Sequence, residues 1–197
     1  GETFYQCKDH MSLLKIMLRI IYINLFLVFG IFTSSSQAIG DSEYQVKAAF
    51  LFNLTQFVEW PDSALPTTNT ALVIGILGEN PFGSYLEDVV SGEVAGGHPL
   101  VIQHYKNVEE IKTCHILFIN LGDPEELRLA IAGLKGQAIL TVSDRNEFIQ
   151  DGGMIRFITR DNKILIQINP VPVKDVHLVI SSKLLQVAEI VSLTTNN

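Results

Sequence analysis

Cysteine and clustered positive charge are what this sequence has least of. The chain of 197 residues has two cysteines, which excludes a disulfide-stabilised scaffold and a cysteine-rich zinc site. Its 14 Lys and Arg residues are outnumbered by 21 Asp and Glu residues, and they form no basic block. Because nucleic-acid binding without sequence preference requires clustered positive charges against the phosphates, we expect no nucleic-acid partner.

Charge of either sign is also sparse, at 18% of the residues, whereas 47% are hydrophobic and the mean hydropathy is +0.28. A chain this apolar is not expected to be disordered, and its length suffices for one domain with its own core. The sequence has no fixed repeat, which excludes collagen and repeat arrays. No linker or shift in composition indicates a second domain.

Residues 1–38 resemble an export signal with additional upstream residues. Lys15 and Arg19 precede an apolar run over residues 20–32, and Ser36-Gln37-Ala38 places small residues where a signal peptidase cuts. The run is about 13 residues long, shorter than the about 20 that a membrane-spanning helix requires. We therefore predict cleavage of this segment and localisation in the periplasm. An uncleaved anchor helix is the alternative.

Removal of that segment would leave a single domain of residues 39–197, in which Cys114 is the sole cysteine. One thiol cannot form an internal disulfide, so Cys114 is either buried or available for a bond to another chain. We keep Cys114 as a candidate redox thiol.

Helical and extended patterns alternate along this domain. We expect helices over residues 43–60, 81–90, 124–134, 144–149 and 181–190, with a helical turn over 108–112. We expect strands over residues 71–77, 99–105, 115–120, 137–142, 154–159 and 163–169. The last two strands are joined by Arg160-Asp161-Asn162, a hairpin signal. This order predicts one α/β domain with a mainly parallel sheet flanked by helices, a C-terminal β-hairpin and a final helix.

The chain offers little for catalysis. None of its mature histidines has a partner at a metal-binding helical spacing, and His115 opens a buried strand as a packed histidine would. Cys114 and His115 are neighbours in a strand and should point to opposite faces, which disfavours an activated thiol. Asp144, Glu147 and Asp151 cluster, but a solvated face explains them better than an acid–base pair. We predict no enzyme, catalytic residue, cofactor or metal; an exported hydrolase with an unfamiliar site is the alternative.

The first expected helix carries more apolar surface than one packing stripe requires. Large aromatic side chains are frequent energetic centres of protein interfaces, so we name as candidate partner-binding residues Phe50, Phe52, Phe57, Trp60, Phe148 and Met154. Gly152-Gly153 would permit a backbone turn that exposes the last of these. The alternative is that all six belong to the core.

The same helix resembles the opening of a known family. Residues 43–61 read EYQVKAAFLFNLTQFVEWP, which is similar to the V-K-A-A-F-L-[YF]-N-[FL]-x-x-F-[VI]-x-W-P signature of the YfiR family. Further similar segments follow in the same order: Asn80-Pro81-Phe82-Gly83, Gly96-Gly97-His98-Pro99-Leu100, Cys114 to Ile119, Leu140 to Asp144, Gly152 to Ile155, and Ser181 to Leu185. The resemblance covers nearly the whole mature chain.

This resemblance implies an exported, α/β, dimeric repressor. It implies that the protein sequesters the periplasmic sensor part of an inner-membrane diguanylate cyclase, lowers cyclic-di-GMP synthesis and so restrains biofilm formation. Reducing conditions, an outer-membrane lipoprotein and cell-wall fragments are the implied inputs. Better-known relatives carry additional cysteines that can pair, whereas Cys114 is alone here, so control through an internal disulfide is not expected. A subunit of a cell-envelope assembly is a further alternative.

Overall fold

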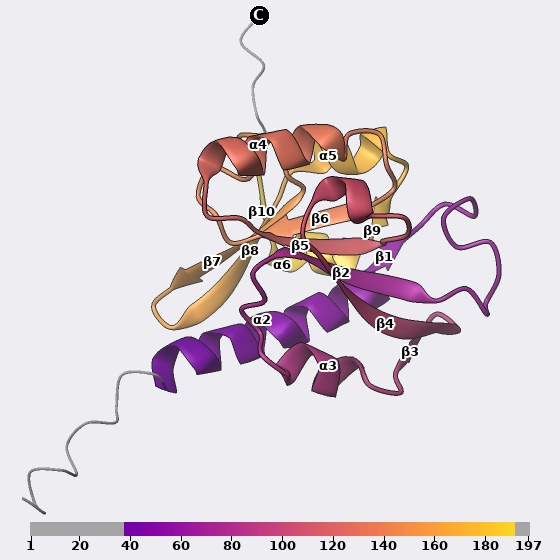
Figure 1. Cartoon of the computed structure of the whole chain (residues 1–197), viewed down its shortest axis with the longest axis horizontal. Coiled ribbons are helices and arrows are strands. Elements are labelled where there is room, and N and C mark those ends of the chain that lie inside the picture. The colour runs from indigo at the N-terminus through magenta and orange to yellow at the C-terminus, as the bar shows by residue number, and fades with distance from the viewer. Residues whose placement is uncertain (1–37, 192–197) are drawn as a thin grey trace, which may run out of the picture. The chain divides into compact units, whose positions relative to one another are not determined.

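The computed structural model describes residues 38–191 (Figure 1). Its helices are α2 (Ala38–Phe57), α3 (Tyr85–Val90), η1 (Val108–Glu110), α4 (Pro124–Gly133), α5 (Pro170–Asp175) and α6 (Ser182–Val187). Its strands are β1 (Val58–Glu59), β2 (Leu72–Gly78), β3 (Val94–Ala95), β4 (His98–Tyr105), β5 (Ile116–Asn120), β6 (Leu140–Ser143), β7 (Ile155–Arg160), β8 (Lys163–Ile168), β9 (Val179–Ile180) and β10 (Glu189–Ile190). The expected export signal before Ala38 lies outside the described residues. Over residues 38–191, no helix is long and apolar enough to cross a membrane.

An eight-stranded sheet in the order β10-β8-β7-β6-β5-β2-β4-β3 organises the domain. β4, β2, β5, β6 and β7 run parallel, while β8 pairs antiparallel with β7, and β3 with β4. In this register, Ile74 of β2 lies opposite Ile102 of β4 on one side and opposite Ile116 of β5 on the other. The predicted α/β class, the mainly parallel sheet and the C-terminal hairpin are confirmed.

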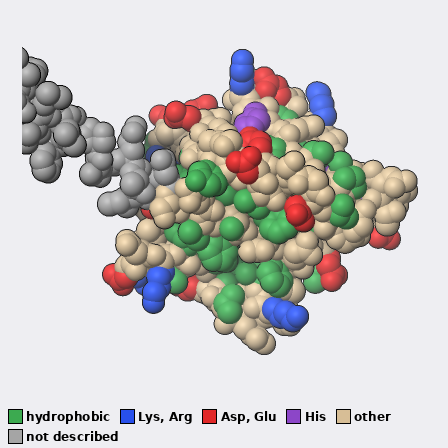
Figure 2. Space-filling model, turned by 90° about the horizontal axis from the view of Figure 1, so that it is seen from below, with side chains coloured by type: hydrophobic (Ala, Val, Ile, Leu, Met, Phe, Trp, Pro, Cys, Tyr) green, Lys and Arg blue, Asp and Glu red, His purple; other side chains and the backbone are tan. Residues whose placement is uncertain are grey.

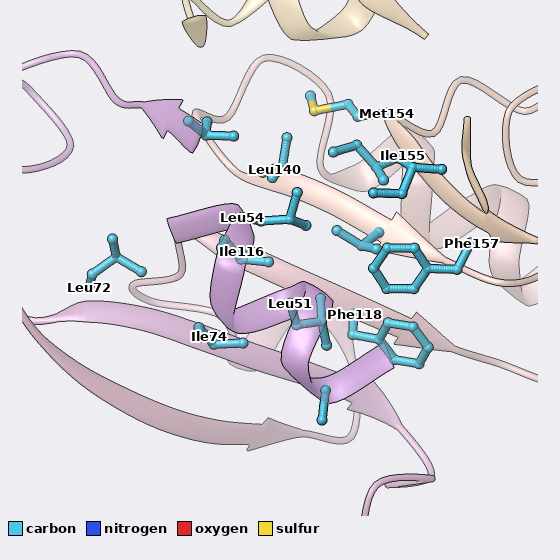
Figure 3. Close-up of a cluster of buried hydrophobic side chains, with 14 of the residues drawn as sticks. Leu51, Leu54, Leu72, Ile74, Ile116, Phe118, Leu140, Met154, Ile155 and Phe157 are labelled. Atoms are coloured by element: carbon cyan, nitrogen blue, oxygen red, sulfur yellow. The ribbon is translucent and has the colours of Figure 1, made fainter. Parts of the chain in front are cut away.

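Alternating side chains of the central strands supply a core on each face of the sheet. On one face, Ile116 and Phe118 of β5 meet Leu51 and Leu54 of α2 (Figure 3). On the other face, Leu117 packs with residues of α4. Both faces are therefore covered, which explains why β2 and β5 read as continuous apolar runs. α4 lies against one face, and α2 and α3 lie against the opposite one (Figure 1).

Local capping determines where several helices begin. The Asp123 side chain accepts the Glu126 N–H at 2.9 Å before Pro124, so α4 starts where Pro in the first turn predicts. Asn169 caps α5 in the same way, with Pro170 in the first turn. The elements expected from the sequence include no helix over residues 170–175, although Pro fits the first turn of a helix.

Two other expected helices differ from the structure. Residues 144–145 after β6 have no regular structure and residues 146–152 form successive turns, so no helix forms there. Residues 81–84 form turns too, so α3 begins only at Tyr85, where the Asn80 side chain has already bonded the Phe82 N–H at 2.9 Å and the Gly83 carbonyl at 3.1 Å. Asn competes for backbone groups in this way and favours turns over helix.

Candidate partner-binding site

The side of α2 that faces away from the sheet is uncharged and partly apolar. Val46, Ala49, Asn53 and Gln56 recur at three- and four-residue spacing, and all four are exposed, Val46 by 44%. We call these four residues the outer stripe. Their opposite side holds the buried residues Leu51 and Leu54, each contributing about 1.5–3 kcal/mol through burial.

Three of the candidate aromatic residues flank the outer stripe. At 100° per residue, Phe50 and Phe57 lie on one side of the stripe and Phe52 lies on the other. All three are partly buried and pack at the margin of the core, with the Phe50 ring centroid 5.9 Å from that of Phe157. Figure 2 views the molecule from the side of α2 and α3; hydrophobic side chains gather on this face with a few Asp and Glu among them, and Lys and Arg lie at its rim.

Phe148 and Met154 do not belong to this surface. Phe148 is fully buried in the cluster that contains α4 residues, and Met154 is 5% exposed. The expectation that the Gly152-Gly153 turn exposes Met154 is wrong. The turn buries it, because the Met154 N–H donates to Thr141 Oγ1 at 3.2 Å and the neighbouring Gly153 lies directly against the Phe148 ring.

Trp60 anchors the chain that follows α2. Its indole Nε1–H donates to the His115 carbonyl at 3.2 Å, and the two rings meet edge to face at 6.2 Å between centroids. His115 accepts the Val73 N–H on Nδ1 at 2.9 Å, so its Nε2 carries the proton and donates to the Ala64 carbonyl at 3.2 Å. Burial lowers the pKa of His115, which remains neutral. The expectation of a packed histidine is confirmed.

Cys114 lies in the cluster on the α4 side of the sheet and is 7% exposed. Burial raises the pKa of its thiol to about 12, against the opposing effect of backbone hydrogen bonds from Gly75 and His115. Since both ring nitrogens of His115 are occupied by the backbone, the imidazole is not available to the thiol. A buried, protonated thiol is neither a nucleophile nor a ready redox group.

A partly buried ionic cluster around the buried Lys47 attaches the N-terminal part of α2 to the sheet. Lys47 is 2% exposed, and its Nζ lies 2.6 Å from Asp144 Oδ2 and 2.5 Å from Glu43 Oε1. The Tyr44 hydroxyl donates to Asp144 Oδ2 at 3.0 Å. The Thr159 hydroxyl donates to Glu43 Oε1 at 2.7 Å. We call Glu43, Tyr44, Lys47 and Asp144 the latch.

The latch is a feature that the sequence reasoning did not identify. Asp144 was expected on a solvated face, but its side chain is only 15% exposed, because it follows β6 directly and faces the start of α2. Burial alone would raise the pKa of Glu43, and the hydrogen bonds from Lys47 and Thr159 outweigh it and lower that pKa. Lys47, the sole cation of α2 and its last charged residue before a long uncharged stretch, is the signal that could have identified it.

A hollow of about 250 Å³ lies at the carboxyl ends of β2, β4 and β5. Leu77, Val108 and Leu121 provide apolar walls, and Lys106 and Glu126 provide charged ones. This is the position where open parallel sheets commonly bind small molecules. None of these residues was singled out from the sequence, because they converge only through the sheet order.

Over the described part of the chain, no cluster of three His, Cys, Asp or Glu residues could hold a metal ion. The family comparison then decides the assignment: the model of the YfiR/HmsC-like family (DUF4154) matches residues 44–189. The chain belongs to the YfiR/HmsC-like family. A comparison with curated proteins finds no match. The family match begins at Tyr44 and ends at Glu189, so it includes the outer stripe, the greater part of the latch and the eight-stranded sheet of this YfiR/HmsC-like domain except Ile190.

Proposed function

We propose that this YfiR/HmsC-like protein is a periplasmic regulator. In this proposal it binds the periplasmic sensor part of an inner-membrane diguanylate cyclase and lowers the synthesis of cyclic-di-GMP. Residues 39–197 are its mature form, released by cleavage of the export signal. An outer-membrane lipoprotein or a cell-wall fragment relieves the inhibition. Family membership supports this function, and the exposed, uncharged outer stripe of α2 is the observation that carries the site.

A helix whose large apolar residues extend beyond one stripe normally has more than one side covered. α2 is covered only on its inner side within the described chain, where Leu51 and Leu54 contact the sheet. The outer stripe has no charge to desolvate, and three phenylalanines flank it. Burying such a surface removes partly exposed aromatic area from water and desolvates no charged group, while the amides of Asn53 and Gln56 require hydrogen-bond partners on the bound protein.

The latch makes this surface rigid before binding. Lys47 and Asp144 attach the first turns of α2 to the end of β6, and Trp60 attaches the segment after α2 to His115. Both ends of the helix are thus held by contacts that the outer stripe does not use. A preorganised surface loses less conformational entropy on association, so more of the contact energy appears as affinity.

Two substitutions on α2 test the site. Ala49→Glu places a charge in the middle of the outer stripe, at a position that contributes nothing to the core. Phe52→Ser removes a flanking aromatic side chain. Binding to the periplasmic domain of a candidate inner-membrane diguanylate cyclase is measured by calorimetry, together with the melting curve of each variant. We expect Ala49→Glu to weaken binding at least tenfold with an unchanged melting temperature.

Leu129→Ser is the matched control, because Leu129 is 57% exposed on α4, across the sheet from α2. It should bind as the unmodified protein does. Equal binding by Ala49→Glu and the control would refute α2 as the site. If Phe52→Ser loses binding and stability together, Phe52 is a core residue. The Ala49→Glu variant alone then shows whether α2 is the binding site.

A further inference from the structure

The hollow beyond the carboxyl ends of β2, β4 and β5 lies where the chain changes sides of the sheet. The chain leaves β2 for α3, whose Leu86 and Val90 pack on the same face as α2. It leaves the neighbouring strand β5 for α4, whose Leu127 and Ile131 pack on the opposite face (Figure 1). Ligands of open α/β sheets bind in the crevice at such a change of side.

Apolar side chains form the floor of this hollow, which has a volume of about 250 Å³. Leu77 at the end of β2, Leu121 after β5 and Ala130 of α4 are all buried, so the core closes the floor. Val108 forms the opposite wall and is only partly buried. The volume is small for a ligand pocket, so it suits a short hydrocarbon group, whose burial would remove apolar surface from water.

Carboxylates outnumber cations around the hollow. Glu126 of α4 and Glu109 of η1 both line it and are exposed, and neither has an ion-pair partner within residues 38–191. Lys106 is the single cation among the lining residues, and it is exposed too, so its ammonium group remains hydrated. Two carboxylates against one ammonium, on a chain of net charge −7, favour a cationic ligand over an anionic one.

We propose that this hollow binds a small organic cation, a primary amine with a short aliphatic chain. The aliphatic chain lies on the floor formed by Leu77, Leu121 and Ala130, and the ammonium group lies at the mouth beside Glu126. Both parts are needed, because an exposed carboxylate alone holds a cation only weakly in water. The proposal does not rest on a cyclase as partner, since α2 lies across the sheet from the hollow.

Three probes with the same aliphatic chain separate charge from hydrophobicity: hexylamine, hexanol and hexanoate. Each is titrated into the isotope-labelled, unmodified chain, and the NMR shifts of backbone amides report where and how tightly it binds. Hexylamine should shift amides of residues 106–109 and 126–133 and bind about fivefold or more tightly than hexanol, with hexanoate weakest. No binding of hexylamine, equal binding of hexylamine and hexanol, tighter binding of hexanoate, or shifts confined to other residues would each overturn the proposal.

Neighbouring glutamates of α4 locate the ammonium group. Glu126→Gln keeps the size of the side chain and removes its charge, so hexylamine should bind about threefold more weakly while hexanol binds as before. Glu125→Gln is the matched control, because it removes the same charge from the same turn although Glu125 pairs with Arg128 and does not line the hollow. It should leave hexylamine binding unchanged. Equal weakening by the two substitutions would overturn the proposal.

Lys106→Met tests the sign of the charge that the hollow recognises. Because the proposed ligand is a cation, removal of the Lys106 ammonium should strengthen hexylamine binding or leave it unchanged. Loss of hexylamine binding in this variant would overturn the proposal. Lys106, Glu125 and Glu126 are all exposed, so the three variants should melt as the unmodified protein does, and a change in binding then reports the site and not the fold.

Discussion

His115 joins three segments through a single neutral ring. Nδ1 accepts from the Val73 N–H of β2, Nε2 donates to Ala64 in the loop after β1, and the ring contacts Trp60. A protonated imidazole has a donor on both nitrogens and would oppose the Val73 N–H. The protonation state of this one residue therefore affects how the loop and the end of α2 attach to the sheet.

The stability of the fold should fall as the pH falls below about 6.5. Burial, with a smaller effect of nearby His98, lowers the pKa of His115 in the folded state, so the unfolded chain binds the proton first. The contribution of neutral His115 to the free energy of unfolding is complete above the ordinary pKa of His. It is lost as the pH decreases from that value to the lower pKa that His115 has in the folded state. Urea titrations between pH 8 and pH 5 measure this dependence.

His115→Ala should flatten that pH dependence and lower the free energy of unfolding at pH 8 by about 1–3 kcal/mol, because the buried Val73 N–H loses its acceptor. His177→Asn is the control, since His177 is exposed and its φ of 60° suits Asn. A His115→Ala variant with the pH profile of the unmodified protein would show that other groups produce the dependence.

Gly153 is one of the glycines that the core requires for space. A Cβ atom built there would lie within 2.3–2.5 Å of three carbons of the buried Phe148 ring. Gly153→Ala should therefore destabilise the fold by about 1–3 kcal/mol through overpacking. Gly133→Ala is the matched control at the end of α4, where the new Cβ has only Val108 at 3.5 Å and should be neutral or stabilising. A melting temperature of Gly153→Ala above that of Gly133→Ala would show that the core does not require a glycine at position 153.

The sequence pattern predicts those helices and strands of this domain whose conformation is determined by the residues within them. β2 and β5 are continuous apolar runs buried on both faces, and α4 begins with an acidic cap and Pro124. Strands of two residues such as β1 and β9 could not be predicted, because they exist only through pairing with each other. The helix expected over 144–149 fails because Asp144 instead bonds Lys47 and Tyr44 of α2.

The latch between α2 and β6 should contribute substantially to stability. Lys47→Met removes the cation and leaves the Asp144 and Glu43 carboxylates close together with no cation between them. Loss of one partner of a buried ion pair costs about 3–5 kcal/mol, which chemical denaturation can measure. Lys106→Met is the control at an exposed lysine and should change stability by less than about 0.5 kcal/mol. Equal effects of the two substitutions would mean that the latch is energetically neutral.

At the scale of the whole molecule, the proposed site lies on the helix that the sequence singled out, but it does not include every residue that the sequence named. The excess apolar surface of the first helix pointed to α2, where Phe50, Phe52 and Phe57 flank the outer stripe. The assignment of Phe148 and Met154 to the surface is wrong. Both side chains are buried in the core, which follows from the folded sheet and not from the local sequence. The exposed members, Val46 and Ala49, required knowledge of which side of α2 the sheet covers.

The central claim is that this YfiR/HmsC-like protein inhibits a membrane diguanylate cyclase through the outer stripe of α2. The most direct measurement is the initial rate of cyclic-di-GMP synthesis by the full-length cyclase in nanodiscs, titrated with the mature protein on its periplasmic side. We predict a saturable fall in rate, retained by Leu129→Ser and lost by Ala49→Glu. A rate unchanged by the unmodified protein, or lowered equally by Ala49→Glu, would contradict the account.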